Sequence, residues 1–159
     1  MLQAGDKLPL NVRVKNSDSQ RVTLKQYLGR PLVIYFYPGN KTPGCILEAT
    51  GFRNLTNSIH QLGAEFLGVS KDSVLFHRKF KRKLDLNFEF LSDEKHRLLK
   101  AFGVWQEKRM FGRSYMGAVR STFIVDSVGE IIKVFPRVKP ERNIHEVYLV
   151  LKKITNTRP

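Results

Sequence analysis

An apolar segment that runs directly into a turn and a helix constrains the fold of this chain most. Residues 31–37 (PLVIYFY) are apolar at odd and even positions alike, which is typical of a strand buried on both faces of a sheet. Residues 38–44 are rich in proline and glycine and predict a turn. Across residues 44–62 apolar side chains recur at helical spacing, and Gly63 ends the segment. The pattern predicts a central strand followed by a covering helix.

Strands and helices alternate along the rest of the chain. The patterns predict strands over residues 11–15, 21–24, 31–37, 64–70, 88–91, 121–125 and 130–135, and helices over residues 24–28, 44–62, 72–84, 92–103 and 141–153. This order favours an α/β fold with a central mixed β-sheet flanked by helices on both faces. At 159 residues the chain fits one domain, with a core over about residues 5–153 and a frayed tail at 155–159.

Composition excludes several classes of protein. With 42% hydrophobic and 26% charged residues, the chain is neither wholly disordered nor a membrane protein. A single cysteine rules out an internal disulfide, and no signal peptide is recognisable, so we expect a cytoplasmic protein, with export that needs no signal left open. The four histidines lack metal-ligand spacing and are expected at the surface. The sequence predicts no metal and no cofactor.

The only cysteine, Cys45, lies where the turn meets the helix. Free N–H groups and the partial positive charge of a helix N-terminus favour the thiolate, which is the nucleophilic form of cysteine. An isolated cysteine is commonly a small buried hydrophobe, but this position favours reactivity. Thr42 stands where a thioredoxin-type Cys-x-x-Cys motif carries its first cysteine, so two-thiol chemistry within the motif is excluded.

The residues around Cys45 resemble a known signature. Pro38, Thr42 and Cys45 match the pattern Pro-x-x-x-Thr-x-x-Cys of peroxiredoxins. Further blocks match in the same order at residues 35–38, 48–49, 51–53, 68–70, 91–93, 102–105, 116–117 and 120–123. The chain therefore resembles a peroxiredoxin of the bacterioferritin comigratory protein (PrxQ) subfamily over almost its whole length. The resemblance implies a thioredoxin-like fold and a thiol-dependent peroxidase that reduces hydrogen peroxide and organic hydroperoxides in antioxidant defence.

The resemblance also implies a role for each residue of the site. Cys45 is the expected nucleophile, which peroxide oxidises to a sulfenic acid. Arg120 is expected to stabilise the thiolate and the developing oxyanion. Thr42 would accept a peroxide proton and orient the O–O bond, and Pro38 would shield the thiolate from water. The backbone N–H groups of Gly44 and Cys45 are the expected substrate-binding groups.

Two further charged residues have two interpretations each. Glu48 either holds Arg120 or is only a favourable charge near a helix N-terminus. Arg53 either adds positive potential at the site or is only a structural charge.

The chain departs from the family pattern at one position. Many members carry a resolving cysteine five residues after the nucleophile, and that position is Thr50 here. With no second cysteine, the resemblance implies a one-cysteine enzyme that needs an external thiol: thioredoxin, a glutaredoxin–glutathione system or a small thiol. An engineered loss of the resolving cysteine stays open. The subfamily resemblance favours a monomer over a dimer.

The net charge of +14, from 28 Lys+Arg against 14 Asp+Glu, is a separate feature. Residues 76–83 form the densest basic run and residues 108–113 form another. Such residues commonly make a solvated surface, but they also fit non-specific binding of nucleic acid or of an anionic surface. The competing hypothesis is therefore a basic thioredoxin-fold protein that binds nucleic acid, with or without peroxidase activity.

Overall fold

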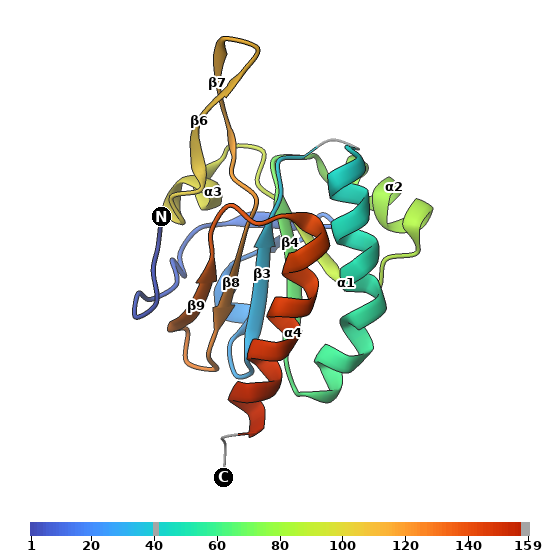
Figure 1. Ribbon diagram of the computed structural model, residues 1–159, viewed down its shortest axis with the longest axis vertical. Helices are drawn as coiled ribbons and strands as arrows, with labels where there is room; N and C mark the ends of the chain where they lie inside the picture. Colours follow the sequence, from blue (N-terminus) through green and yellow to red (C-terminus); the bar gives the residue numbers. More distant parts are fainter. Residues whose placement is uncertain (40–41, 157–159) are drawn as a thin grey trace.

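The computed structural model describes residues 1–39 and 42–156, and a mixed seven-stranded sheet forms its centre (Figure 1). The strand order is β2-β1-β5-β4-β3-β8-β9. These strands are β1 (Val14–Asn16), β2 (Arg21–Val22), β3 (Leu32–Phe36), β4 (Glu65–Ser70), β5 (Glu89–Ser92), β8 (Ser121–Val125) and β9 (Ile131–Phe135). The helical elements are η1 (Leu24–Tyr27), α1 (Pro43–Gln61), α2 (Val74–Leu84), α3 (Arg97–Ala101) and α4 (Pro140–Asn156).

Strand β3 lies between β4, which is parallel to it, and β8, which is antiparallel. Its side chains alternate between two hydrophobic cores. Ile34 and Phe36 pack with residues of α3 and η1, whereas Val33 and Tyr35 pack with residues of α1, α2 and α4. Because both faces of β3 are buried, its apolar run needs no polar positions. The predicted mixed sheet with helices on both faces is confirmed.

Helices α1 and α4 lie against each other on one face of the sheet, and Gly51 marks their contact (Figure 1). A Cβ atom placed on Gly51 would come within 2.0 Å of Ile144 Cδ1. The missing side chain therefore gives Ile144 the space it occupies. This packing brings the first residues of both helices to the same end of the molecule, where Cys45 lies.

Several predicted boundaries were wrong. The helix predicted over 92–103 is only Arg97–Ala101, because Ser92 still belongs to β5 and the buried Asp93 carboxylate accepts the Leu99 N–H at 2.7 Å. The first strand begins at Val14 rather than at residue 11. Helix α4 ends at Asn156 rather than at residue 153, and residues 157–159 of the predicted frayed tail lie outside the described residues, so the fraying stays a prediction. No helix in the described ranges is long and apolar enough to cross a membrane.

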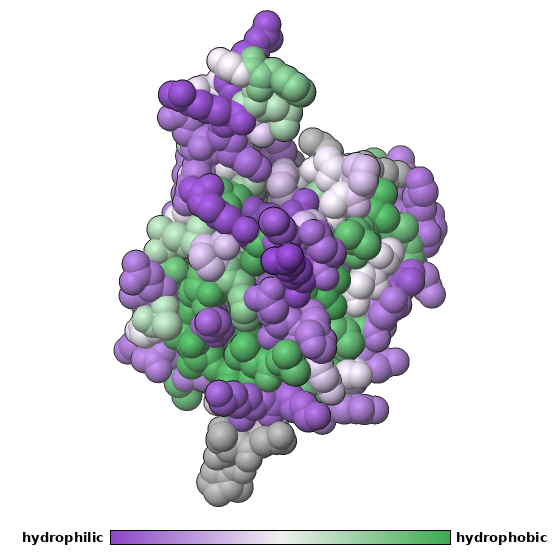
Figure 2. Space-filling model, in the orientation of Figure 1, coloured by the Kyte–Doolittle hydropathy of each residue, from purple (hydrophilic) through white to green (hydrophobic). Residues whose placement is uncertain are grey.

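A second sheet was not predicted at all. Strands β6 (Trp105–Met110) and β7 (Arg113–Ala118) form an antiparallel hairpin that projects from the end of the molecule where α1 and α4 begin (Figure 1). Most of its side chains are polar or exposed, so no apolar alternation marks it in the sequence. Apolar side chains appear near its tip (Figure 2). The exposed large apolar residues of the hairpin are Met110, Phe111, Tyr115 and Met116.

The turn of this hairpin holds a bulky residue in an unfavourable backbone conformation. Phe111 has φ 51° and Gly112 has φ 76°, so both residues are left-handed, as in the two-residue turns that favour Asn-Gly. Glycine adopts this region freely, but a β-carbon makes it costly. Phe111 is 98% exposed, so core packing does not offset the cost.

We therefore predict that Phe111→Asn stabilises the fold. Asparagine tolerates the left-handed region, and the change should add about 1 kcal/mol to the free energy of unfolding, which raises Tm by about 2–4 °C. Thermal unfolding measures this. Val128→Asn is the matched control, because Val128 is 79% exposed and its φ is not positive. An equal gain in both variants, or none in Phe111→Asn, would show that the backbone conformation is not the cause.

Candidate active site

The start of α1 holds Cys45 at a fixed position. Thr42 is the N-cap residue, with extended backbone (φ −81°, ψ 153°), and Pro43 occupies the first helical position. The Thr42 Oγ1 atom accepts a hydrogen bond from the Cys45 N–H at 3.3 Å. Cys45 is only 2% exposed. The cap thus ties the cysteine backbone to the residue that lies three positions before it.

Arg120, just before β8, is the charged group that meets the cysteine sulfur. Its Nη2 atom lies 3.3 Å from Cys45 Sγ. The Val138 N–H donates to the Arg120 carbonyl at 2.9 Å, which holds the arginine backbone. A guanidinium at this distance stabilises negative charge on the sulfur.

Glu48 occupies the other side of the guanidinium. Arg120 Nη1 donates to Glu48 Oε1 at 2.6 Å, and the side chain of Glu48 is 0% exposed while that of Arg120 is 13% exposed. Burial raises the pKa of Glu48 to about 7, against the opposing effect of Arg120. Burial disfavours the charge on Arg120, but Glu48 and the Cys45 sulfur outweigh it and raise the pKa of Arg120. Arg120 therefore stays a cation between carboxyl and sulfur.

The loop that follows β3 also lies beside the Cys45 sulfur. Pro38 is half-buried and precedes Gly39, whose carbonyl oxygen lies 4.0 Å from Cys45 Sγ. Gly39 has φ +93°, and a Cβ atom on it would lie 3.1 Å from Asp72 Oδ1, so both its backbone and its surroundings favour glycine. Residues 40–41 of this loop lie outside the described residues.

Comparisons with known proteins decide the family. The family model described as AhpC/TSA family matches residues 4–134. This chain belongs to that family. Peroxiredoxin Bcp of Bacillus subtilis is 42% identical to it over 151 residues, which cover 95% of this chain and 96% of the relative. Peroxiredoxin Bcp of Escherichia coli K12 is 38% identical over 148 residues, which cover 93% and 94%.

Solved structures of peroxiredoxins agree with the sequence relatives. A crystal structure of a PrxQ mutant from Xylella fastidiosa superposes with TM-score 0.91 at 36% identity, covering 97% of this chain and 98% of that one. A structure of the Xanthomonas campestris bacterioferritin comigratory protein, described for alkyl peroxide reduction, gives TM-score 0.87 at 35% identity, covering 94% and 99%. The chain is thus a peroxiredoxin of the Bcp/PrxQ type with a thioredoxin fold, and a thiol-dependent peroxidase.

Two residues singled out from the sequence lie in structural contacts of this peroxiredoxin. Arg53 donates to the Leu84 carbonyl at 2.6 Å and so fastens α1 to the end of α2, which is the structural interpretation of its charge. Thr50, at the expected resolving position, donates from Oγ1 to the Ile46 carbonyl at 2.9 Å. Its hydroxyl therefore bonds back to the preceding turn of α1.

The structure corrects the prediction that the histidines lie at the surface. His60 and His145 are exposed, but His96 is half-buried and stacks on Trp105, and His77 is fully buried. His77 lies three residues before Phe80, so the two share the buried face of α2, and this spacing was the available signal. The described residues hold no group of three or more His, Cys, Asp or Glu that could bind a metal.

His77 belongs to a buried polar network that sequence reasoning missed. Its Nε2 atom hydrogen-bonds the Tyr37 hydroxyl at 2.7 Å and the Ser70 hydroxyl at 2.9 Å, and its Nδ1 atom bonds Ser92 Oγ at 2.6 Å. Burial lowers the pKa of His77 to about 3, with a smaller effect of the Lys81 charge, so the ring is neutral at neutral pH. Ser70 also donates to Asp72 at 2.9 Å, and Asp72 lies against Gly39. Through Asp72, the network therefore contacts Gly39 in the loop beside Cys45.

The raised pKa of Glu48 predicts a pH-dependent stability. Between about 4.5 and about 7 the folded protein holds a proton on Glu48 that the unfolded chain has released, so this carboxyl lowers the free energy of unfolding as pH rises. In Glu48→Gln this contribution is absent. The difference in unfolding free energy, variant minus parent, should therefore increase across this pH range in denaturant titrations.

Glu65→Gln is the matched control for this prediction. Glu65 also pairs with an arginine, Arg30 at 2.9 Å, but the pair is solvent-exposed and should contribute little. Parallel pH profiles for Glu48→Gln and the parent protein would contradict the assignment.

Proposed function

We propose that this peroxiredoxin reduces hydrogen peroxide and organic hydroperoxides through a sulfenic acid at Cys45, and that an external thiol completes each cycle. The observation that supports this most is the Arg120 guanidinium 3.3 Å from the sulfur of the only cysteine. The sulfur lies at the start of a long helix, where the helix dipole also favours negative charge.

In the first step the Cys45 thiolate attacks one peroxide oxygen and the O–O bond breaks. The sulfur becomes a sulfenic acid, and the second oxygen leaves as water or as an alcohol after taking a proton. Arg120 stabilises the negative charge that develops on the leaving oxygen. The peroxide is thus the oxidant and Cys45 is the group oxidised.

In this proposal two groups orient the peroxide and a third shields the thiolate. Thr42 Oγ1 has a second lone pair that accepts a hydrogen bond from the peroxide O–H while the first accepts the Cys45 N–H. Because the Cys45 N–H already donates to Thr42, the Gly44 N–H is the better placed of the two expected amide donors. Pro38 has no N–H group and limits access of water to the thiolate.

In the second step an external thiolate attacks the sulfenic sulfur. An S–S bond forms, the S–O bond breaks, and the hydroxide leaves as water after protonation. A second thiolate then attacks the mixed disulfide at the reductant's sulfur and releases the Cys45 thiolate. With threonine at position 50, the sulfenic acid waits for this outside thiol, and excess peroxide can oxidise it further.

Other expectations remain predictions. Non-specific binding of nucleic acid rests on the net charge of +14 alone and gains no support from the geometry around Cys45. A monomer is expected from the subfamily resemblance. A cytoplasmic location is expected because a lone cysteine suits a reducing compartment.

We predict that Cys45→Ser abolishes peroxide reduction. Intact-mass analysis after one equivalent of hydrogen peroxide should show one added oxygen in the parent protein and none in the variant. Addition of a small thiol should then convert the oxidised protein to a mixed disulfide and finally restore its original mass. Equal peroxide consumption by parent and Cys45→Ser would refute the proposal.

Arg120→Leu should slow sulfenic acid formation by about a hundredfold, because it removes the cation that stabilises charge on sulfur and oxygen. Arg30→Leu is the matched control, since Arg30 forms an exposed ion pair with Glu65. Stopped-flow measurement of Cys45 oxidation gives the rate. A similar rate in both variants would remove Arg120 from the mechanism.

A further inference from the structure

Three segments meet beside the cysteine: the start of α1, the start of α4 and the base of the β6–β7 hairpin (Figure 1). A Cβ atom placed on Gly44 would lie 3.3 Å from Arg120 Nη2 and 3.5 Å from Pro140 Cγ. A reactant larger than hydrogen peroxide must therefore place the rest of its atoms against these segments.

One face of the hairpin presents a cation toward this site. Lys108 is paired with Tyr115, and Gln106 with Gly117, so the four side-chain positions share a face. Gly117 lets the Lys108 chain lie flat, because a Cβ atom there would come within 3.0 Å of Lys108 Cδ. Lys108 Nζ then donates to the Ala118 carbonyl at 3.0 Å. This hydrogen bond holds the Lys108 ammonium group at the carbonyl of Ala118, which precedes Arg120 by two positions in the sequence.

A second cation, Arg137, lies on the same face of the hairpin as Lys108. Arg137 Nη2 donates to Gln106 Oε1 at 3.0 Å, which draws its guanidinium to the same face of the hairpin. Partial burial lowers the pKa of Lys108, and repulsion by Arg120, Lys71 and Arg137 adds to this, while the Cys45 thiolate opposes it. All four charged groups therefore act on Lys108 across the site.

In the described ranges, acidic side chains do not neutralise the cluster that Lys108 and Arg137 form. Lys108 and Arg137 form no ion pair in the part of the chain that the structure describes, and Glu48 is the carboxylate that pairs with Arg120. Glu48 is itself fully buried, so it presents no charge at the surface. The approach to Cys45 carries an excess of positive charge that remains available to a reactant.

We propose that Lys108 and Arg137 bind the carboxylate of the external thiol, so that the preferred reductant is a small thiol that carries a carboxylate. This rests on the proposed function. Hydrogen peroxide reacts at Cys45, Thr42 and Arg120, and it has no non-hydrogen atoms beyond its O–O unit with which to bind a second group. The thiol is the larger reactant that every cycle requires, and its reactive form is also an anion.

The cluster acts on both thiol steps. Its positive charge attracts the first thiolate, which forms the S–S bond and displaces hydroxide from the sulfenic sulfur. It then attracts the second thiolate, which forms the free disulfide and releases the Cys45 thiolate. Two thiols are oxidised to one disulfide, and the peroxide has already taken up the two electrons.

Three thiols of similar size and different charge test this. Mercaptoacetate is an anion, mercaptoethanol is neutral and cysteamine is a cation. After Cys45 has been oxidised with one equivalent of hydrogen peroxide, the second-order rate constant for each thiol is measured on the same protein. The informative quantity is the ratio of the mercaptoacetate constant to the mercaptoethanol constant, because comparing this ratio between proteins cancels the intrinsic reactivity of each thiol.

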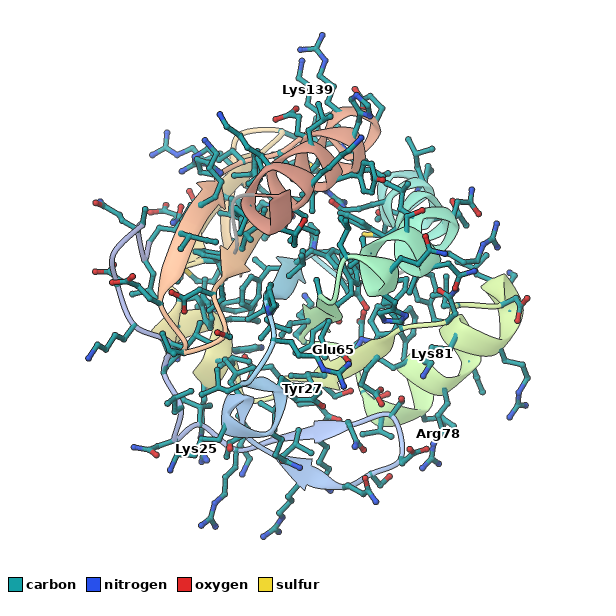
Figure 3. All side chains as sticks on the ribbon, turned by 90° about the horizontal axis from the view of Figure 1, so that it is seen from below. Lys25, Tyr27, Glu65, Arg78, Lys81 and Lys139 are labelled. Carbon is teal, nitrogen blue, oxygen red and sulfur yellow. The ribbon has the colours of Figure 1, made fainter. Side chains whose placement is uncertain are left out.

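Lys108→Gln should lower this ratio by about threefold to tenfold, and should raise the corresponding ratio for cysteamine, because one nearby positive charge is lost. Lys108→Arg keeps the charge and should largely retain the ratio. Lys25→Gln is the matched control, since Lys25 is exposed on η1, which belongs to a different part of the chain from the hairpin, and it lies at the lower left edge of the view in Figure 3. It should leave the ratio unchanged.

Two results would overturn the inference. The first is an unchanged ratio in Lys108→Gln. The second is an equal fall in Lys25→Gln, which would assign the effect to the net charge of +14 rather than to the cluster. Intact mass after peroxide treatment separates the two proposals: if sulfenic acid forms at Cys45 but the ratio does not respond, the carboxylate site is wrong and the peroxidase mechanism stands.

Discussion

The structure of the site depends on one guanidinium that joins two groups. Arg120 places one nitrogen 2.6 Å from Glu48 and another 3.3 Å from the Cys45 sulfur. Cys45 and Glu48 lie three residues apart on α1, so Arg120, which directly precedes β8, contacts both side chains at the helix start. Because Glu48 is buried and its pKa is raised to about 7, the arginine keeps an excess of positive charge for the sulfur.

Local sequence patterns predicted the parts of this arrangement that depend on neighbouring residues. The apolar run of β3, the Pro/Gly turn and the helix that follows it are all readable over a few positions, whereas the cap at Thr42 was not predicted. The long-range contact of Arg120 with Cys45 was accessible only through the resemblance to a family, because 75 residues separate the two.

The features that escaped prediction depend on partners from distant elements. His77 is buried because Tyr37, Ser70 and Ser92 satisfy its ring nitrogens, and these residues come from three other parts of the chain. The β6–β7 hairpin has exposed polar strands, so it lacks the alternation that reveals a half-buried strand. For His77 and for the β6–β7 hairpin, residue type alone did not predict the structure, because the structure depends on contacts with distant elements.

A double-mutant cycle on Glu48 and Arg120 tests the central claim most directly. The rate of sulfenic acid formation at Cys45 is measured in the parent protein, Glu48→Gln, Arg120→Leu and the double variant. If Glu48 acts on the sulfur through Arg120, the double variant is no slower than Arg120→Leu alone. If the two losses multiply, the residues act independently, and the account of one guanidinium joining carboxyl and sulfur is contradicted.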